Sequence, residues 1–205
     1  GRGAASLEEV TALLTRANRP VETSAMRILV SIGTTESMAI AIAKMLTEPA
    51  GDSKSNLLKV FGNIRNVDVS DVIVDMISSE KRPEGLTNLK CILSAMEGSE
   101  VVDVLARRIA DEADQAELAK YLDVLAGMSK PSNTEALEGI LAGDRRDSVQ
   151  MAVASALAKI GDSRACTILA SHGATNTYCE KALADVRSPY AQQALMDIAA
   201  GSTHR

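Results

Sequence analysis

The sequence predicts an all-α fold, a right-handed α-solenoid of about six two-helix repeats with a period of 32 residues. Three observations support this prediction. Large apolar residues recur at this period without gaps, as is typical of helical repeat arrays. The composition is rich in the helix formers Ala, Leu, Met, Glu and Lys, whereas only one Phe and three Tyr are present. Pro and Gly punctuate the chain at short intervals, where helix ends are expected.

The period is clearest where the first helix of each expected pair ends. The apolar residues of this row are Leu29, Phe61, Leu93, Leu125 and Leu157. A second row follows three residues later with Ile32, Ile64, Met96, Met128 and Ile160. Nine residues further on, the second helices contribute Ala41, Ile73, Leu105, Leu137 and Leu169. Each helix pair is apolar on two sides, so stacking on its neighbours is needed to bury both.

The first expected helix, residues 6–17, stands apart from the pairs. It begins with a capping box in which Ser6 and Glu9 satisfy each other's backbone donors. Leu13 falls on a row of the second helices, so this helix is interpreted as the second half of a repeat. The chain is therefore expected either to begin inside a longer array or to carry a lone capping helix.

Helix pairs then follow to the end of the chain, which is expected to form a single domain, residues 1–205. In the first pair Pro20 opens one helix and Gly33 ends it. A second capping box is expected from Ser132 to Glu135, after the turn at Pro131. The repeats are expected at about 20–48, 53–80, 84–113, 114–142, 145–173 and 175–200, the last shortened by six residues.

One repeat carries a more specific motif. In residues 152–170 the motif consists of Ala156-Leu157, Ile160-Gly161, Asp162 and Arg164-Ala165. This segment resembles the HEAT repeat, in the short form found in phycobilisome-lyase-type HEAT-like proteins. The resemblance implies a non-enzymatic scaffold or adaptor that holds a protein or peptide on the concave face formed by second helices. HEAT-like relatives also suggest two alternative functions. The first is a chromophore lyase or chaperone-like subunit, and the second is a nucleic-acid-binding HEAT-like module.

Composition narrows these alternatives. The net charge of −5 disfavours a general nucleic-acid or anionic-membrane binder. No run of about 18 apolar residues is present to span a bilayer. Two histidines, one of them in the tail, suggest no catalytic set, so we expect neither enzymatic activity nor a cofactor. Three cysteines at irregular spacing favour free thiols and a reducing, cytoplasmic location, or an extracytoplasmic one if the chain is an excised domain.

Charged residues on the second helices are the candidate partner-binding residues. Asp71, Asp103 and Glu135 recur at the 32-residue period and predict an acidic ladder for a partner with a basic segment. Arg107 and Arg108 add basic charge beside it. The alternative is that these acids complement helix dipoles and that the charges form solvated local ion pairs.

A metal site is not expected. Cys166, His172 and Cys179 are the available ligands, but their spacing matches no zinc template. Cys179 also shares a row with Val153 and Tyr121, which predicts a buried structural thiol.

Overall fold

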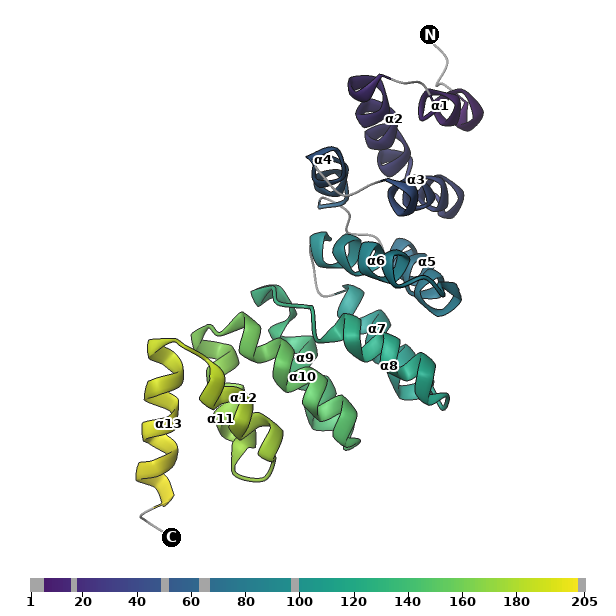
Figure 1. The fold of residues 1–205 in the computed structure, drawn as a ribbon. Helices are drawn as coiled ribbons and strands as arrows, with labels where there is room; N and C mark the ends of the chain where they lie inside the picture. The colour runs from purple at the N-terminus through teal and green to yellow at the C-terminus, as the bar shows by residue number, and fades with distance from the viewer. Residues whose placement is uncertain (1–5, 16–17, 49–51, 63–66, 97–99, 203–205) are drawn as a thin grey trace. The chain divides into compact units, whose positions relative to one another are not determined.

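The computed structural model describes residues 6–15, 18–48, 52–62, 67–96 and 100–202, and this part of the chain is built from helices joined by short turns (Figure 1). No β-strand occurs in these residues, which confirms the predicted all-α class. The chain divides into two compact units, Gly1–Val104 and Leu105–Arg205. That residues 1–205 form a single domain stays a prediction.

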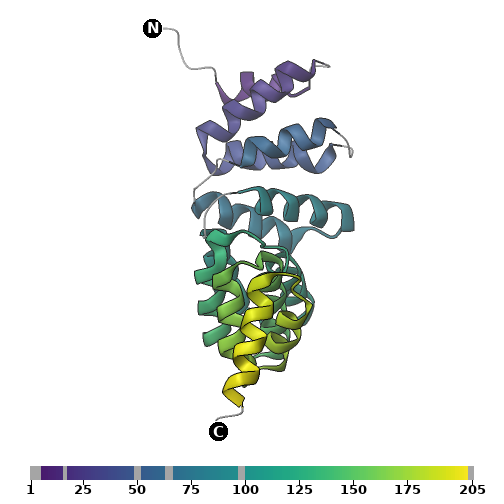
Figure 2. The ribbon, with the colours of Figure 1, turned by 90° about the vertical axis from the view of Figure 1, so that its left-hand side faces the viewer.

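The N-terminal unit contains α1 (Leu7–Leu13), α2 (Arg19–Ile32), α3 (Thr35–Thr47), α4 (Asp52–Phe61), α5 (Val67–Ser79) and α6 (Pro83–Ala95). Helix α2 contacts α1, α3 and α4; α3 contacts α5 and α6; and α4 contacts α6. Figure 2 shows these helices as successive layers. Helices α2, α3 and α4 therefore each pack on a neighbour in sequence and on a helix of the next pair.

Helix α7 (Glu100–Asp111) crosses the boundary between the units. The C-terminal unit continues with α8 (Gln115–Leu125), the 3₁₀ turn η1 (Pro131–Asn133), α9 (Thr134–Gly143), α10 (Asp147–Ile160), α11 (Ser163–Gly173), α12 (Thr177–Asp185) and α13 (Pro189–Ser202). Helix α10 contacts α8, α9, α11 and α12, and α11 contacts α9, α12 and α13. The packing again links alternate helices as well as consecutive ones.

The apolar rows found in the sequence form the core of each unit. The side chains of the row from Leu29 to Leu157 are at most 1% exposed, and those of the row from Ala41 to Leu169 are fully buried. The residues of the row that begins at Ile32 are buried to different degrees. Met96 and Met128 are buried, Ile160 is half-buried, Ile64 lies outside the described residues, and Ile32 is 41% exposed because it lines an open groove beside α4.

Helix ends follow the expected local chemistry with one exception. The Ser6–Glu9 capping box is confirmed, with the Ser6 amide donating to Glu9 Oε2 at 2.8 Å and the Glu9 amide donating to Ser6 Oγ at 3.2 Å. Gly33 and Gly161 end their helices at φ of 67° and 62°, a conformation that side chains rarely adopt.

The exception is the capping box expected from Ser132 to Glu135, which is wrong. Pro131 starts a 3₁₀ turn that includes Ser132, and the residue that precedes α9 is Asn133, whose side chain makes no capping hydrogen bond. Among the described helices, none is long and apolar enough to cross a membrane.

Candidate functional site

The predicted partner-binding residues lie on three second helices. Asp71 is half-buried on α5, Asp103, Arg107 and Arg108 are exposed on α7, and Glu135 is exposed on α9. In the C-terminal unit, Glu135 Oε2 accepts from Arg164 Nη2 of α11 at 3.4 Å. Such an exposed pair contributes about 0–1 kcal/mol to stability. The acidic ladder stays a prediction.

The cysteines behave as core residues. Cys166 and Cys179 are buried, whereas Cys91 is exposed. Burial raises the pKa of Cys179 to about 11 and also raises the pKa of Cys166, so both side chains are neutral thiols at pH 7. Within the described part of the chain, no three His, Cys, Asp or Glu side chains are grouped so that they could hold a metal ion.

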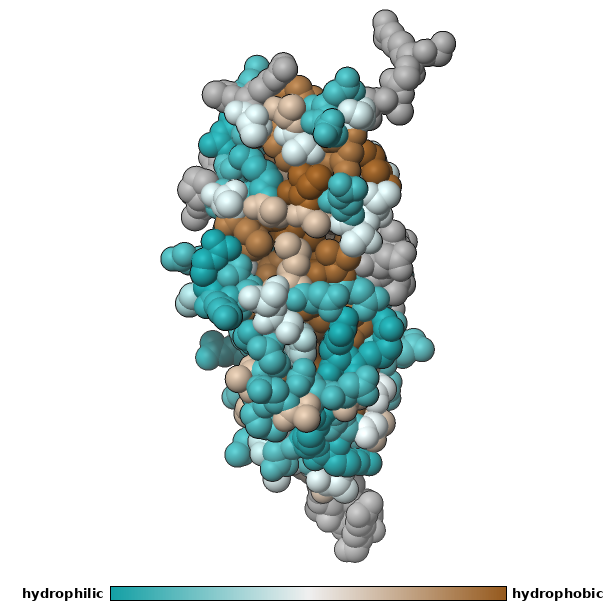
Figure 3. Space-filling model, turned by 90° about the vertical axis from the view of Figure 1, so that its right-hand side faces the viewer, coloured by the Kyte–Doolittle hydropathy of each residue, from teal (hydrophilic) through white to brown (hydrophobic). Residues whose placement is uncertain are grey.

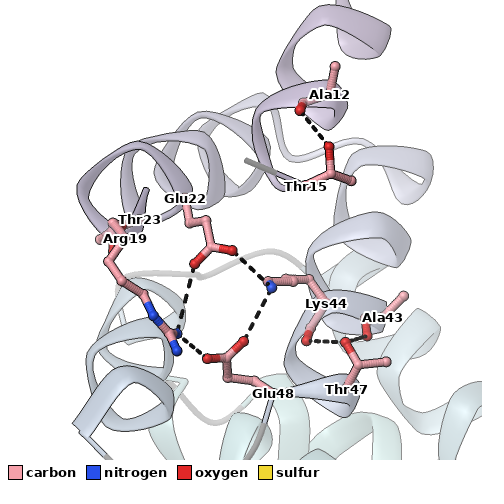
Figure 4. Close-up of polar contacts among 9 residues, drawn as sticks. All are labelled: Ala12, Thr15, Arg19, Glu22, Thr23, Ala43, Lys44, Thr47 and Glu48. Atoms are coloured by element: carbon pink, nitrogen blue, oxygen red, sulfur yellow. Dashed lines mark hydrogen bonds and ion pairs between the residues drawn. The ribbon is translucent and has the colours of Figure 1, made fainter. Parts of the chain in front are cut away.

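A ring of four charged residues joins α2 and α3 in the N-terminal unit (Figure 4). Lys44 Nζ donates to Glu22 Oε1 at 3.1 Å and lies 3.2 Å from Glu48 Oε2. Arg19 Nη1 pairs with Glu48 and lies 3.8 Å from Glu22 Oε2, which closes the ring. The Glu48 side chain is only 4% exposed, so its charge depends on these two cations for compensation.

The environment of Lys44 keeps it charged. Desolvation by burial alone would lower its pKa, but its hydrogen bonds to Glu22 and Glu48 outweigh burial and hold the pKa above the usual value. The hydrogen bond to Glu48 likewise raises the pKa of Arg19. Both cations are therefore retained at physiological pH, and α2 and α3 are held together by opposite charges.

An open groove of about 1120 Å³ runs between α2 and α4 of the same unit. Three of its lining side chains are basic: Arg19, Arg27 and Lys59. Its other lining residues are Pro20, Thr23, Ser24, Val30, Ser31, Ile32, Gly33, Asn56, Val60 and Val69. Among the described residues around it, none is a carboxylate, so the groove has a basic character in an acidic chain.

Polar contacts between helices of the C-terminal unit mostly use backbone carbonyls. Arg146 Nη2 donates to the Ile109 carbonyl at 2.6 Å and Arg146 Nη1 to the Glu112 carbonyl at 3.3 Å. Gln150 Nε2 donates to the Leu141 carbonyl at 2.8 Å and also to that of Asp144, while Lys159 Nζ donates to Ala126 at 2.6 Å. These side chains donate to carbonyls at or just beyond helix C-termini, where the regular hydrogen bonds of the helix stop.

A second, smaller groove of about 490 Å³ lies between α10 and α12. It is lined by Met151, Ala154, Ser155, Ala158, Lys159, Tyr178, Lys181, Ala182, Asp185 and Val186. This groove differs from the first because Asp185 stands among its basic residues and Lys159 already donates to the Ala126 carbonyl.

Sequence analysis missed an acidic residue that recurs where one helix pair leads into the next. Glu80 accepts from the Arg82 amide at 2.9 Å, Glu112 from the Asp114 amide at 2.8 Å, and Asp144 from the Arg146 amide at 3.0 Å. Each acceptor precedes its donor by two residues. Successive acceptors are 32 residues apart, so the acidic residue at this position of the period could have been recognised from the sequence. The repeated hydrogen bond satisfies a free backbone donor at each turn.

In two of these three turns, Glu80 with Arg82 and Asp144 with Arg146, the side chains also form an ion pair. Hydrogen bonds from the Arg82 side chain lower the pKa of Glu80 to about 2, and those from Arg146 lower the pKa of Asp144. The acidic row therefore has a structural role at the turns, separate from the predicted acidic ladder on the second helices.

Comparison with known proteins identifies no relative. No protein-family model and no curated protein matches the chain. Among solved structures, the chain is similar to an engineered protein whose crystal structure comes from the Northeast Structural Genomics Consortium, at 17% identity and a TM-score of 0.33. The match covers 95% of this chain and 62% of the engineered protein. A likeness this low supports no conclusion on family or function.

Proposed function

We propose that the chain is a non-enzymatic scaffold, an α-solenoid of six HEAT-like repeats that binds another protein along its second helices. The observation that carries this proposal is the order of helix contacts inside each unit. Alternate helices pack on one another, α2 on α4 and α3 on α5 in one unit, α10 on α12 and α9 on α11 in the other. Packing of this kind produces extended surfaces made of successive helices, which repeat proteins use for binding.

The character of the second helices fits a protein partner. Helix α3 carries the half-buried Ile40 and Leu46, and α5 carries Val72 and Met76. Figure 3 shows hydrophobic side chains over the N-terminal unit, whereas the surface of the C-terminal unit in the same view is mostly hydrophilic. Apolar residues beside charged ones are the usual composition of a protein interface. The proposed contacts for basic residues of the partner are Asp71 and Asp103 in the N-terminal unit and Glu135 in the C-terminal unit, and Arg107 and Arg108 of α7 are further candidate contacts.

A peptide-display selection on the immobilised full chain tests this proposal. We expect the selected peptides to combine Lys or Arg with aliphatic residues. Reversing two charges of the ladder, with Asp103→Lys and Glu135→Lys together, should weaken their binding at least about tenfold, because like charges then face each other. The matched control, Glu84→Lys with Glu180→Lys, makes the same charge change on the first helices α6 and α12 and should leave binding unchanged.

Two results would contradict the proposal. One is a selection that yields no peptide with measurable affinity for the full chain. The other is an equal loss of affinity in the ladder variant and the control variant, because only the overall charge of the chain would then matter.

A further inference from the structure

We infer that the groove between α2 and α4 is a second binding site, which takes an extended acidic peptide segment of a partner protein. Apart from Val69 of α5, its described lining residues lie on or beside the first helices α2 and α4, and none of them is a residue proposed above to contact a partner. Its dimensions, its charge and the hydrogen-bonding capacity of its walls each point to this ligand.

The length of the groove suits an extended peptide. Its lining residues run along α2 from Arg19 and Pro20 at one end to Ile32 and Gly33 at the other. Helix α2 has 14 residues. At about 1.5 Å per residue this helix is about 20 Å long, the span of roughly six extended residues. A single phosphate or carboxylate ion would leave most of this volume empty.

The charge of the groove calls for an acidic ligand. Arg27 and Lys59 are exposed on its two walls, and Lys59 makes only a 3.5 Å contact with Asn56 Oδ1. No ion pair of Arg27 occurs within the described residues. Arg19 stands at the end of the groove with its guanidinium held by the buried Glu48. Two exposed cations and one oriented cation, with no described carboxylate among the lining residues, complement the charge of an Asp- or Glu-rich segment.

The hydroxyl groups of the groove suit a peptide backbone. Thr23, Ser24 and Ser31 each donate their hydroxyl hydrogen to a carbonyl of α2, at 3.1, 2.9 and 2.8 Å. Their donor capacity is therefore used within the helix, while lone pairs on the oxygens can accept from the N–H groups of a bound peptide. A phosphate has no such donor when fully ionised and would gain nothing from these groups.

Apolar residues of the groove favour a peptide over a nucleic acid. Ile32, 41% exposed, lines the groove together with Val30 and Val60 and offers contact to an aliphatic side chain. The described lining includes no aromatic residue on which a base could stack, and stacking supplies much of the affinity for single strands. The occupant is therefore an acidic segment that also carries aliphatic residues.

Fluorescence anisotropy on the full chain tests this inference. The probe is a fluorescein-labelled eight-residue peptide that alternates Glu with Leu, and the competitor probes are a Lys–Leu peptide of the same length and an oligothymidylate of the same charge. We expect the Glu–Leu peptide to bind best. Arg27→Glu with Lys59→Glu should reduce its affinity at least about tenfold, because two attractive charges become repulsive.

The control variant is Lys181→Glu with Arg187→Glu, which makes the same change in net charge at exposed positions of the C-terminal unit. It should bind the Glu–Leu peptide like the wild type. Ile32→Ser, in a background with the basic residues intact, should weaken binding several-fold if an aliphatic side chain occupies the groove. Circular dichroism of each variant confirms that the helices are retained.

Several outcomes would overturn the inference. These are the absence of binding by the Glu–Leu peptide at millimolar concentration, equal losses in the groove and control variants, or binding of the oligothymidylate at least as tight as that of the peptide. The last result would assign the groove to nucleic acid instead.

Discussion

The two units place different polar chemistry at the same position of the 32-residue period. Glu22 and Gln150 are separated by four periods, and both lie near the start of a first helix. In the N-terminal unit Glu22 pairs with Lys44, so opposite charges join α2 to α3. In the C-terminal unit Gln150 donates to the Leu141 and Asp144 carbonyls, so an amide joins α10 to the end of α9.

Between Glu22 and Gln150, the same position of the period holds Leu86, which is half-buried, and Leu118, which is buried. The packing of these helices therefore accepts a polar group at this position where its hydrogen bonds are satisfied, but does not require one. The N-terminal unit also contains one contact of the second kind, from Asn88 Nδ2 to the Leu46 carbonyl at 3.4 Å. Charge pairs depend on salt and pH, whereas amide–carbonyl hydrogen bonds hardly do. The apolar rows, by contrast, have the same chemistry in both units, so truncating one of their side chains should cost a similar free energy of unfolding in either unit.

The largest expected effect tests that shared core. Leu29→Ala in the N-terminal unit and Leu157→Ala in the C-terminal unit both empty a buried position. Each should lower the free energy of unfolding by about 2–5 kcal/mol, measured by urea denaturation followed by circular dichroism. Met196→Ala, at an exposed position, is the control and should cost little. A cost near that of the control for either leucine would show that the two cores are not equivalent.

The next comparison separates the two kinds of polar contact. Glu48→Gln removes one charge of the ring, and Gln150→Leu removes the amide donor to two carbonyls. Each should cost about 1–3 kcal/mol, since buried partners lose their hydrogen bonds. Raising NaCl to about 1 M should reduce the cost of Glu48→Gln and leave that of Gln150→Leu unchanged, because screening acts on charges. The same salt dependence for both variants would remove the distinction.

Replacing each of two glycines by alanine should change the stability by a smaller amount, with opposite signs at the two positions. A Cβ at Gly85 would overlap the Glu80 carboxylate, which Arg82 holds in place, whereas a Cβ at Gly139 on α9 would meet nothing within 4 Å. Gly139→Ala should therefore stabilise the chain by about 0.5–1 kcal/mol through helix propensity. Gly85→Ala should destabilise it by roughly 1 kcal/mol or more as the contact is relieved. Thermal unfolding distinguishes the two signs, and stabilisation by Gly85→Ala would contradict the packing described here.

The smallest effect concerns the turn at Glu80. Its pKa is lowered in the folded chain from 4.5 to about 2, so its ionised form stabilises the fold above pH 4.5 and this contribution is lost as the pH falls towards 2. Glu80→Gln should lower the melting temperature slightly at pH 7, and its difference from wild type should shrink between pH 4.5 and 2. A difference that stays constant through this window would show that the Glu80 charge does not stabilise the turn.

The sequence predicted much of the fold and little of the polar sites. The helical class, the αL ends at Gly33 and Gly161 and the buried rows that begin at Leu29 and Ala41 were predictable, whereas the row that begins at Ile32 is not buried throughout, since Ile32 is 41% exposed. The period predicts the positions of the candidate residues Asp71, Asp103 and Glu135 but not their contacts, such as the pair that Glu135 forms with Arg164. The capping box at Ser132 failed because Pro131 favours a 3₁₀ turn over an immediate helix start. The charged ring and the basic groove were not predicted.

Local side-chain preferences and the spacing of apolar residues determine where helices begin, where they end and which face is buried, so the sequence alone established these features. Arg19 and Glu48 are 29 residues apart, and Gln150 and Asn176 are 26 apart, yet both pairs are joined in the structure. Such partners meet only when one helix docks on another at a particular angle and register. The tertiary structure therefore decided which charges compensate each other and where an open groove remains.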